Sequence, residues 1–115
     1  MWHFIPPNTT VFAPNNEAWS ELEREDLELM QDTERLKKII GNSVLGKRED
    51  VNEMARKNKK TYAIRGNPIK VSRTHEGIMV NDKAHVVREN VFFGDSFINI
   101  IDKVIQGTYH IFNLN

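Results

Sequence analysis

The sequence contains no cysteine, has no net charge and has no long apolar run. The lack of cysteine excludes disulfide frameworks, thiol catalysis and thiolate metal sites. Sixteen basic residues balance sixteen acidic ones, so no overall field favours nucleic acid, and we expect no nucleic-acid partner. Every apolar run is much shorter than the roughly 18 residues of a membrane span, so we expect no membrane insertion by this segment.

Residues that serve in common catalytic sites are present, but not in the patterns that catalysis uses. The four histidines are separated by long intervals and lack the short spacing of a metal site. The six glycines are scattered singly, which argues against a phosphate-binding loop. No serine has the glycine flanks of a nucleophile elbow. The sequence therefore predicts a protein that is not an enzyme and that uses no cofactor and no metal.

The segment from Thr10 to Trp19 predicts a short strand followed by a helix. Pro14 is suited to end the strand, and the asparagines after it are suited to cap the helix. A short second helix should follow. A third helix is expected over residues 33 to 41, capped by Asp32 or Thr33 and ended by Gly41. The first third of the chain is thus predicted to be one strand and three short helices.

The second half of the chain has the alternation and the turn residues of strands. Its last predicted strand, Phe97 to Ile105, has apolar residues on both faces, as a central buried strand requires. We expect this strand to lie beside the Thr10 segment in a shared interior. The charge-dense stretch Gly46 to Lys60 is expected to be a surface connection with one helical turn, Asp50 to Met54. Strands and helices in this order indicate an α+β fold.

Two stretches have a recognisable form. Residues 10 to 19 read Thr-Val-Phe-Ala-Pro-Asn-Asn-Glu-Ala-Trp, and residues 95 to 105 read Asp-Ser-Phe-Ile-Asn-Ile-Ile-Asp-Lys-Val-Ile. They resemble the two signatures of the fasciclin-like adhesion domain, with Asp95, Ser96 and Asn99 in place of the usual Asn, Gly and His of the second. The resemblance spans nearly the whole chain. It implies an α+β domain, an antiparallel β-wedge or sandwich packed with short helices.

The resemblance also implies a function and a place. Such domains act in cell adhesion or as protein-interaction modules of the extracellular matrix, secreted or at the cell surface, as glycoproteins and in tandem with domains of the same kind. The implied partners are an integrin-like cell-surface receptor or a matrix protein. The resemblance implies no catalysis.

In integrin-binding family members, an Asp and an aliphatic residue precede the second signature. The corresponding candidates for partner binding here are Asn90, Val91 and Phe92. An amide is a weaker ligand than a carboxylate for a hard receptor-bound cation, so Asn90 counts against a simple transfer of integrin binding. The alternative for Val91, Phe92 and Phe93 is core packing, and we favour it.

A second departure and a basic cluster support two rival functions. Asn42-Ser43 stand where the family usually has Tyr-His, and this loss favours a structural spacer between adhesive neighbours. The cluster Arg56, Lys57, Lys59 and Lys60 could bind a glycan such as a glycosaminoglycan. A solvated loop is the simpler interpretation of that cluster, because no aromatic residue interleaves it.

The chain divides into three parts on this evidence. Residues 1–9 are expected to be an extended arm or a truncated start, residues 10–107 a single fasciclin-like domain, and residues 108–115 a tail or linker. Asn8, in the triplet Asn8-Thr9-Thr10, is a candidate N-glycosylation site if the protein is secreted.

Overall fold

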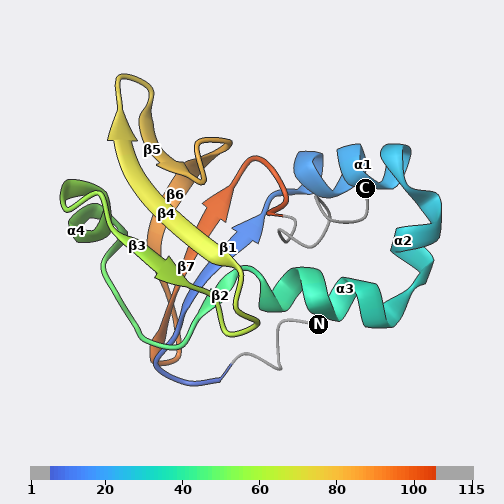
Figure 1. The fold of residues 1–115 in the computed structure, drawn as a ribbon, viewed down its shortest axis with the longest axis horizontal. Helices are drawn as coiled ribbons and strands as arrows, with labels where there is room; N and C mark the ends of the chain where they lie inside the picture. The colour runs from blue at the N-terminus through green and yellow to red at the C-terminus, as the bar shows by residue number, and fades with distance from the viewer. Residues whose placement is uncertain (1–5, 106–115) are drawn as a thin grey trace.

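A computed structural model describes residues 6–105, apart from the side chains of residues 29 and 30. Within these residues the chain forms a mixed helix and strand fold with a seven-stranded sheet, which confirms the α+β prediction (Figure 1). The strands are β1 (Thr10–Pro14), β2 (Val44–Leu45), β3 (Lys60–Tyr62), β4 (Pro68–Thr74), β5 (Gly77–Val80), β6 (Ala84–Phe93) and β7 (Ser96–Ile101). The helices are α1 (Asn16–Glu25), α2 (Leu27–Gln31), α3 (Thr33–Gly41) and α4 (Val51–Arg56).

The strand order of the sheet is β2-β1-β7-β6-β5-β4-β3. Strands β1 and β7 pair in parallel, with Val11 opposite Ile98 and Ala13 opposite Ile100, and the other neighbours pair antiparallel. The predicted contact between the two signature stretches is therefore confirmed. The pairing holds the beginning and the end of the described chain together as the second and third strands of the sheet.

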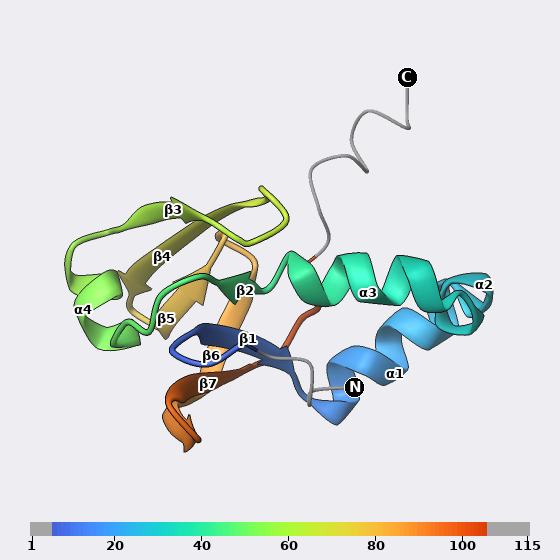
Figure 2. The ribbon, with the colours of Figure 1, turned by 90° about the horizontal axis from the view of Figure 1, so that it is seen from below.

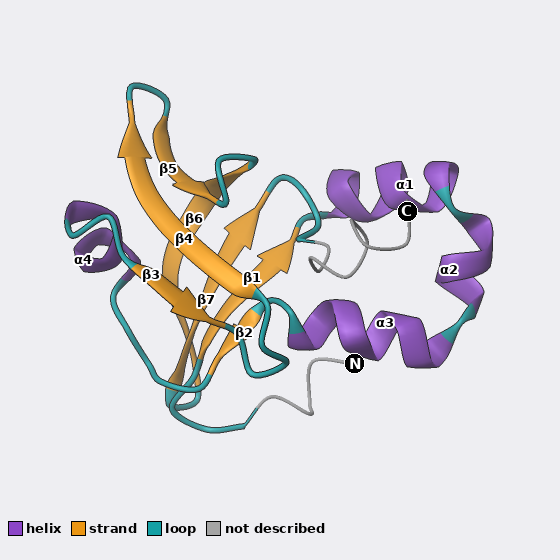
Figure 3. Cartoon of the chain, viewed as in Figure 1, coloured by secondary structure: helices purple, strands orange, loops and turns teal. Residues whose placement is uncertain are grey.

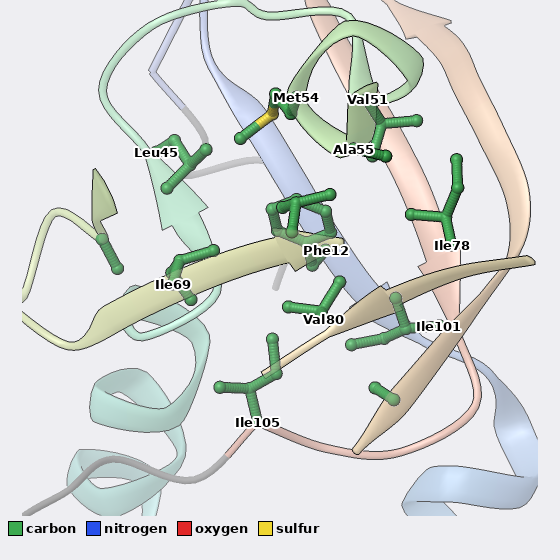
Figure 4. Close-up of a cluster of buried hydrophobic side chains, with 13 residues drawn as sticks. Phe12, Leu45, Val51, Met54, Ala55, Ile69, Ile78, Val80, Ile101 and Ile105 are labelled. Atoms are coloured by element: carbon green, nitrogen blue, oxygen red, sulfur yellow. The ribbon is translucent and has the colours of Figure 1, made fainter. Parts of the chain in front are cut away.

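The sheet is strongly curved, and the core lies inside the curve. In Figure 2, β3 and β4 form an upper layer above β1 and β7. The backbone N–H of Ile64 donates to the carbonyl of Val44 at 2.7 Å, which ties the two ends of the sheet together. Figure 4 shows the side chains that fill the interior around Phe12. They are Phe12, Leu45, Val51, Met54, Ala55, Ala63, Ile69, Val71, Ile78, Val80, Ala84, Ile101 and Ile105.

Helices α1, α2 and α3 form an arch at one end of the sheet, and α4 lies at the opposite end (Figure 3). As predicted, an asparagine caps the first helix: the Asn15 side chain accepts a hydrogen bond from the N–H of Ala18 at 2.8 Å. Ile40 of α3 packs against Val11 and Val44, on the opposite side of β1 from Phe12. Both faces of β1 are therefore covered, which explains why all five of its residues are buried.

Helix α4 overturns the prediction that Gly46 to Lys60 is only a surface connection. Its Val51 and Met54 are 0% and 2% exposed, and together with Ala55 they point into the main core (Figure 4). The Asp50 carboxylate caps the helix by accepting hydrogen bonds from the backbone N–H groups of Asn52 and Glu53. The three apolar residues of this charge-dense stretch all lie on one face, so a single helical turn closes the end of the core.

The last predicted strand is shorter than expected. Strand β7 ends at Ile101 and does not continue to Ile105, because the chain bends after it. Val104 is still buried, in a cluster with the α1 and α3 residues Ala18, Leu22 and Ile39, while Ile105 joins the main core. The apolar pattern was thus a correct signal of burial but a wrong signal of strand length. Of the predicted flanking parts, the arm is described only from residue 6, and the tail 108–115 lies outside the described residues.

The Asn42-Ser43 pair occupies a buried junction where α3 meets β2. Both residues are buried, and the carbonyl of Ser43 accepts a hydrogen bond from the N–H of Phe12 at 2.8 Å. The Ser43 hydroxyl donates to the carbonyl of Ile39 at 3.4 Å, and the side-chain amide of Asn67 donates to the carbonyl of Asn42 at 3.5 Å. Small polar residues therefore make backbone contacts at this position.

Candidate protein-interaction site

The candidate partner-binding residues Asn90, Val91 and Phe92 lie on β6, close to its hairpin with β7. Phe92 is 70% exposed and Phe93 is 51% exposed, so the favoured prediction that these aromatic residues pack in the core is wrong for both. Figure 2 shows this closed end of the hairpin projecting below the rest of the sheet. Large apolar side chains this accessible on a paired hairpin are a candidate contact surface.

Strand β6 is irregular where it approaches the aromatic residues. Two register shifts, between Val86 and Arg88 and between Arg88 and Val91, each accommodate one extra residue against β7. Asn90 has a left-handed backbone conformation with φ of 51° at the second bulge. Two extra residues restore the alternation of faces, so the bulges do not by themselves turn Phe92 outward. Phe92 and Phe93 are neighbours in a strand and point to opposite faces, yet both are exposed, because this end of the hairpin projects from the sheet (Figure 2).

Asn90 itself is occupied inside the structure. Its Oδ1 accepts from the N–H of Val51 at 3.0 Å, and its side chain also hydrogen-bonds the Asp50 carboxylate. Its own N–H donates to Oδ1 of Asn99 at 2.8 Å. Asn99 is completely buried in β7, and its Nδ2 has no hydrogen-bond partner within residues 6–105. Asn90 thus links β7, the second bulge of β6 and the N-terminus of α4.

These hydrogen bonds affect the charge state of Asp50. Burial works to raise the pKa of Asp50, but the hydrogen bonds from the Asn90 side chain and from the N–H groups of Asn52 and Glu53 outweigh it and hold the pKa below its usual value of 3.8. The carboxylate is therefore ionised at neutral pH. The asparagine in β7 was a visible sequence signal for this network, because it interrupts an otherwise apolar run.

Phe92 belongs to a small surface made by two segments of the chain. Its ring centroid is 5.0 Å from that of Phe97, in a tilted arrangement. The guanidinium of Arg48 lies 5.5 Å from the Phe97 centroid, and its Nη1 donates to the carbonyl of Asp95 at 3.4 Å. We call Arg48, Phe92, Phe93 and Phe97 the aromatic hairpin surface. It combines exposed apolar area with one fixed cation.

The structure separates the basic cluster into paired and exposed residues. Arg56 makes an ion pair with Glu53 at 2.6 Å, and Lys59 makes one with Glu49. Lys57 follows α4 and Lys60 begins β3, and both are exposed. Two of the four cations predicted for glycan binding are thus already neutralised by neighbouring carboxylates.

The candidate glycosylation residue Asn8 is exposed and has a left-handed conformation, with φ of 59°. Thr9 and Thr10, which follow Asn8 in the sequence, are buried, and the Thr10 hydroxyl donates to the carbonyl of Lys47 at 2.7 Å. Asn8 is therefore exposed, while Thr9 is buried just before β1 and Thr10 is the first residue of that strand.

Sequence reasoning missed a histidine with two carboxylate neighbours, because its partners are distant along the chain. Nε2 of His85 lies 2.8 Å from Oε2 of Glu76, and Nδ1 lies 3.2 Å from Oδ2 of Asp102. The hydrogen bond to Glu76 raises the pKa of His85 above its usual value of 6.5, and Asp102 raises it further against the opposing effect of desolvation. Within residues 6–105, no three histidine, aspartate or glutamate side chains, these three included, are grouped to hold a metal ion. No helix in this range is both long and apolar enough to cross a membrane.

Comparison with known proteins places the chain in a family. The Fasciclin domain family profile matches residues 5–107. The structure is similar to that of a FAS1 domain pair from the insect cell adhesion molecule Fasciclin I, with a TM-score of 0.67 and 19% sequence identity. The match covers 89% of this chain and 38% of that one, so this chain spans well under half of the solved structure. A search of curated proteins found no match.

The profile match covers most of the sequence, and the solved FAS1 structure has the same fold. Fasciclin domains are a family associated with cell adhesion, typically extracellular or at cell surfaces, often in tandem and generally non-catalytic. The chain therefore belongs to the fasciclin domain family.

Proposed function

We propose that this domain is a non-catalytic adhesion module of the extracellular matrix or cell surface that binds a protein partner through its aromatic hairpin surface. The partner is an integrin-like receptor or a matrix protein, and the binding residues are Val91 and Phe92 with their neighbours. The observation that carries the proposal is the 70% exposure of Phe92 near the closed end of the β6–β7 hairpin. Aromatic residues and arginine are the side chains that contribute most to protein interfaces.

The hairpin has the properties of a preformed contact surface. Phe92 and Phe97 pack against each other in a tilted arrangement with ring centroids 5.0 Å apart, so covering them would bury apolar area without first ordering either ring. Arg48 is fixed by its contact with the Phe97 ring and its hydrogen bond to Asp95, which holds a cation beside the aromatic rings. A partner with an apolar depression next to a carboxylate would match this arrangement.

Asn90 has a supporting role in this proposal. Its side chain bonds Val51 and Asp50 and so does not reach toward a partner. It holds the second bulge of β6, two residues before Phe92. We therefore assign the contact to the aromatic residues and the positioning to Asn90.

Cell attachment to surfaces coated with the purified domain tests the proposal. We expect the native domain to support attachment and Phe92→Ala to weaken partner binding roughly tenfold or more, as removal of a central interface residue does. Val87→Ala is the matched control, because Val87 is also an exposed apolar residue of β6 at 52%. Circular dichroism should show both variants folded.

Two outcomes would oppose the proposal. A native domain that supports no attachment and binds no matrix protein would remove the adhesive function. If Asn90→Asp then created attachment, the native domain would be a structural spacer between adhesive neighbours. If Phe92→Ala and Val87→Ala weakened partner binding equally, the contact would not lie at the hairpin tip.

We also propose that Asn8 is glycosylated when the domain is secreted, since its side chain is exposed. Treatment of the secreted protein with an amidase that removes N-glycans should increase its gel mobility. Asn8→Gln should abolish that change.

A further inference from the structure

His85 connects three segments that are far apart in the sequence. It lies at the start of β6, Glu76 lies in the turn between β4 and β5, and Asp102 follows β7. The two ring nitrogens lie 2.8 Å from a Glu76 oxygen and 3.2 Å from an Asp102 oxygen. Both nitrogens of one ring therefore face carboxylates.

This geometry depends on the protonation state of the ring. The imidazolium form has two N–H donors and can donate to both carboxylates, whereas neutral imidazole has only one. After deprotonation, one carboxylate faces a nitrogen lone pair, which repels it. The arrangement is complete only while His85 carries a positive charge.

The two carboxylates are not held equally well. Oδ1 of Asp102 also accepts from the backbone N–H of His85 at 2.7 Å, and the N–H of Asp102 donates to the His85 carbonyl at 3.1 Å. Asp102 therefore stays in place without the ring. The Glu76 side chain is 75% exposed, and its carboxylate has the His85 ring as its only hydrogen-bond partner within residues 6–105. When His85 loses its proton, Glu76 is therefore the carboxylate that separates from the ring.

Three other residues with ionisable side chains lie next to the site along the chain. Lys103, next to Asp102, makes an ion pair with Glu21 of α1 at 2.9 Å. Lys83 lies two residues before His85, and His75 precedes Glu76. The two carboxylates are the groups that hydrogen-bond the His85 ring.

We propose that Glu76, His85 and Asp102 form a proton-dependent clasp that fastens the β4–β5 turn to the segment after β7. In the protonated state the turn is held against the body of the domain. As the pH rises, His85 loses its proton and the turn is released. The hydrogen bonds of the β4–β5 pairing do not titrate in this range, so the two strands remain paired. The hydrogen bond from the Glu76 N–H to Thr74 lies inside the turn and opens more often once the turn is released.

The direction of the pH effect follows from the surroundings of His85. The bond to Glu76, with the charge of Asp102, raises the pKa of His85 above 6.5 in the folded protein. A group with a raised folded pKa stabilises the structure fully below its unfolded pKa and loses that effect as the pH rises through the folded value. The clasp should thus be closed below about pH 6.5 and open above the raised pKa. It does not depend on which partner the domain binds.

Nuclear magnetic resonance of the intact domain tests the clasp. We expect the His85 ring to titrate with a midpoint above 6.5 and Glu76→Gln to lower that midpoint. After correction for intrinsic rates, the Glu76 amide should exchange roughly two- to fivefold more slowly at about pH 5.5 than at about pH 8.5. In His85→Gln, whose side chain does not titrate, this difference should disappear.

Matched controls keep the result interpretable. Glu34→Gln removes an exposed carboxylate that pairs with Lys37 on α3, and it should leave the His85 midpoint unchanged. Amide protection that depends on pH equally in the native domain and in His85→Gln would overturn the proposal. A His85 midpoint that does not respond to Glu76→Gln would overturn it as well, even if His85→Gln failed to fold.

Discussion

Replacing Asn90 with aspartate tests the relation between the family's acidic position and the architecture of this chain. The substitution keeps an oxygen that can accept from the N–H of Val51, now at 3.0 Å from Oδ1 of Asn90. It removes the amide that hydrogen-bonds the Asp50 carboxylate and puts a second carboxylate in its place. We therefore expect Asn90→Asp to destabilise the domain at neutral pH.

The expected loss is about 1 to 2 kcal/mol. A hydrogen bond to a charged group contributes about 1.5 to 3 kcal/mol, and the lower part of that range applies because Asp50 is exposed. Repulsion between the two carboxylates adds to the loss, while solvent screens it. For a domain of this size, such a loss lowers the melting temperature by roughly 5 to 10 °C.

The pH dependence of the loss is the more specific result. In the native domain the pKa of Asp50 lies below 3.8, so its stabilising effect is present above that value and is lost as the pH falls through the folded pKa. In the variant, two adjacent carboxyl groups can share a proton, which raises the pKa of one of them. The difference in melting temperature between native and variant should therefore shrink as the pH falls from about 7 toward about 4.

Thermal unfolding followed by circular dichroism at several pH values measures this effect. Asn58→Asp is the matched control, because Asn58 has a similar left-handed conformation, with φ of 50° against 51° for Asn90, but lies exposed between two lysines. We expect the control to change stability by less than about 0.5 kcal/mol. An Asn90→Asp variant as stable as the native domain at pH 7, or a deficit that does not change with pH, would refute the proposed link between Asn90 and Asp50.

Three further predictions concern the core, a helix end and the basic cluster. Phe12→Ala should cost about 3 to 5 kcal/mol in the free energy of unfolding, because Phe12 is completely buried in the main core; a loss below about 1 kcal/mol in urea unfolding would contradict its central place. A Cβ at Gly41 would lie 2.2 Å from Cγ of Arg65, so Gly41→Ala should lower the melting temperature of the native domain. In an Arg65→Ala background the clash is gone and the helix preference for alanine remains, so the same substitution should raise the melting temperature. A change of the same sign in both backgrounds would be inconsistent with the clash. Arg56 and Lys59 are already paired with carboxylates, which leaves Lys57 and Lys60 as the two cations of the cluster that could bind a glycan. Two exposed cations are a weak binding site, so we expect charge reversal of both to leave retention on a heparin column unchanged. A clear loss of retention would instead support the glycan-binding alternative.

Much of the fold could be predicted from the sequence because local patterns carry it. Pro14 and Asn15 mark the end of β1 and the start of α1 wherever the rest of the chain lies. The apolar pattern around Ile98 and Ile100 predicted a central strand, and the structure pairs it with β1 as expected. The pattern failed at α4, where the isolated Val51 and Met54 in a charged stretch gave little sign that they close the core.

The candidate sites were decided by the tertiary structure. The sequence placed Phe92 in an apolar triplet, which favoured burial, but the residue lies at an end of the β6–β7 hairpin that projects from the sheet, where 70% of it stays exposed. A local pattern cannot reveal how far a hairpin extends past the rest of the sheet, nor the two bulges of β6, because both are visible only in the pairing with β7. His85 and Asp102 were separate polar residues in the sequence, and they meet because β6 and β7 are neighbours in the sheet. The sequence by itself determined where most helices and strands form, since these depend on nearby residues. The tertiary structure decided where β7 ends, whether Phe92 reaches solvent and which charges meet at His85, because these depend on segments far apart in the chain.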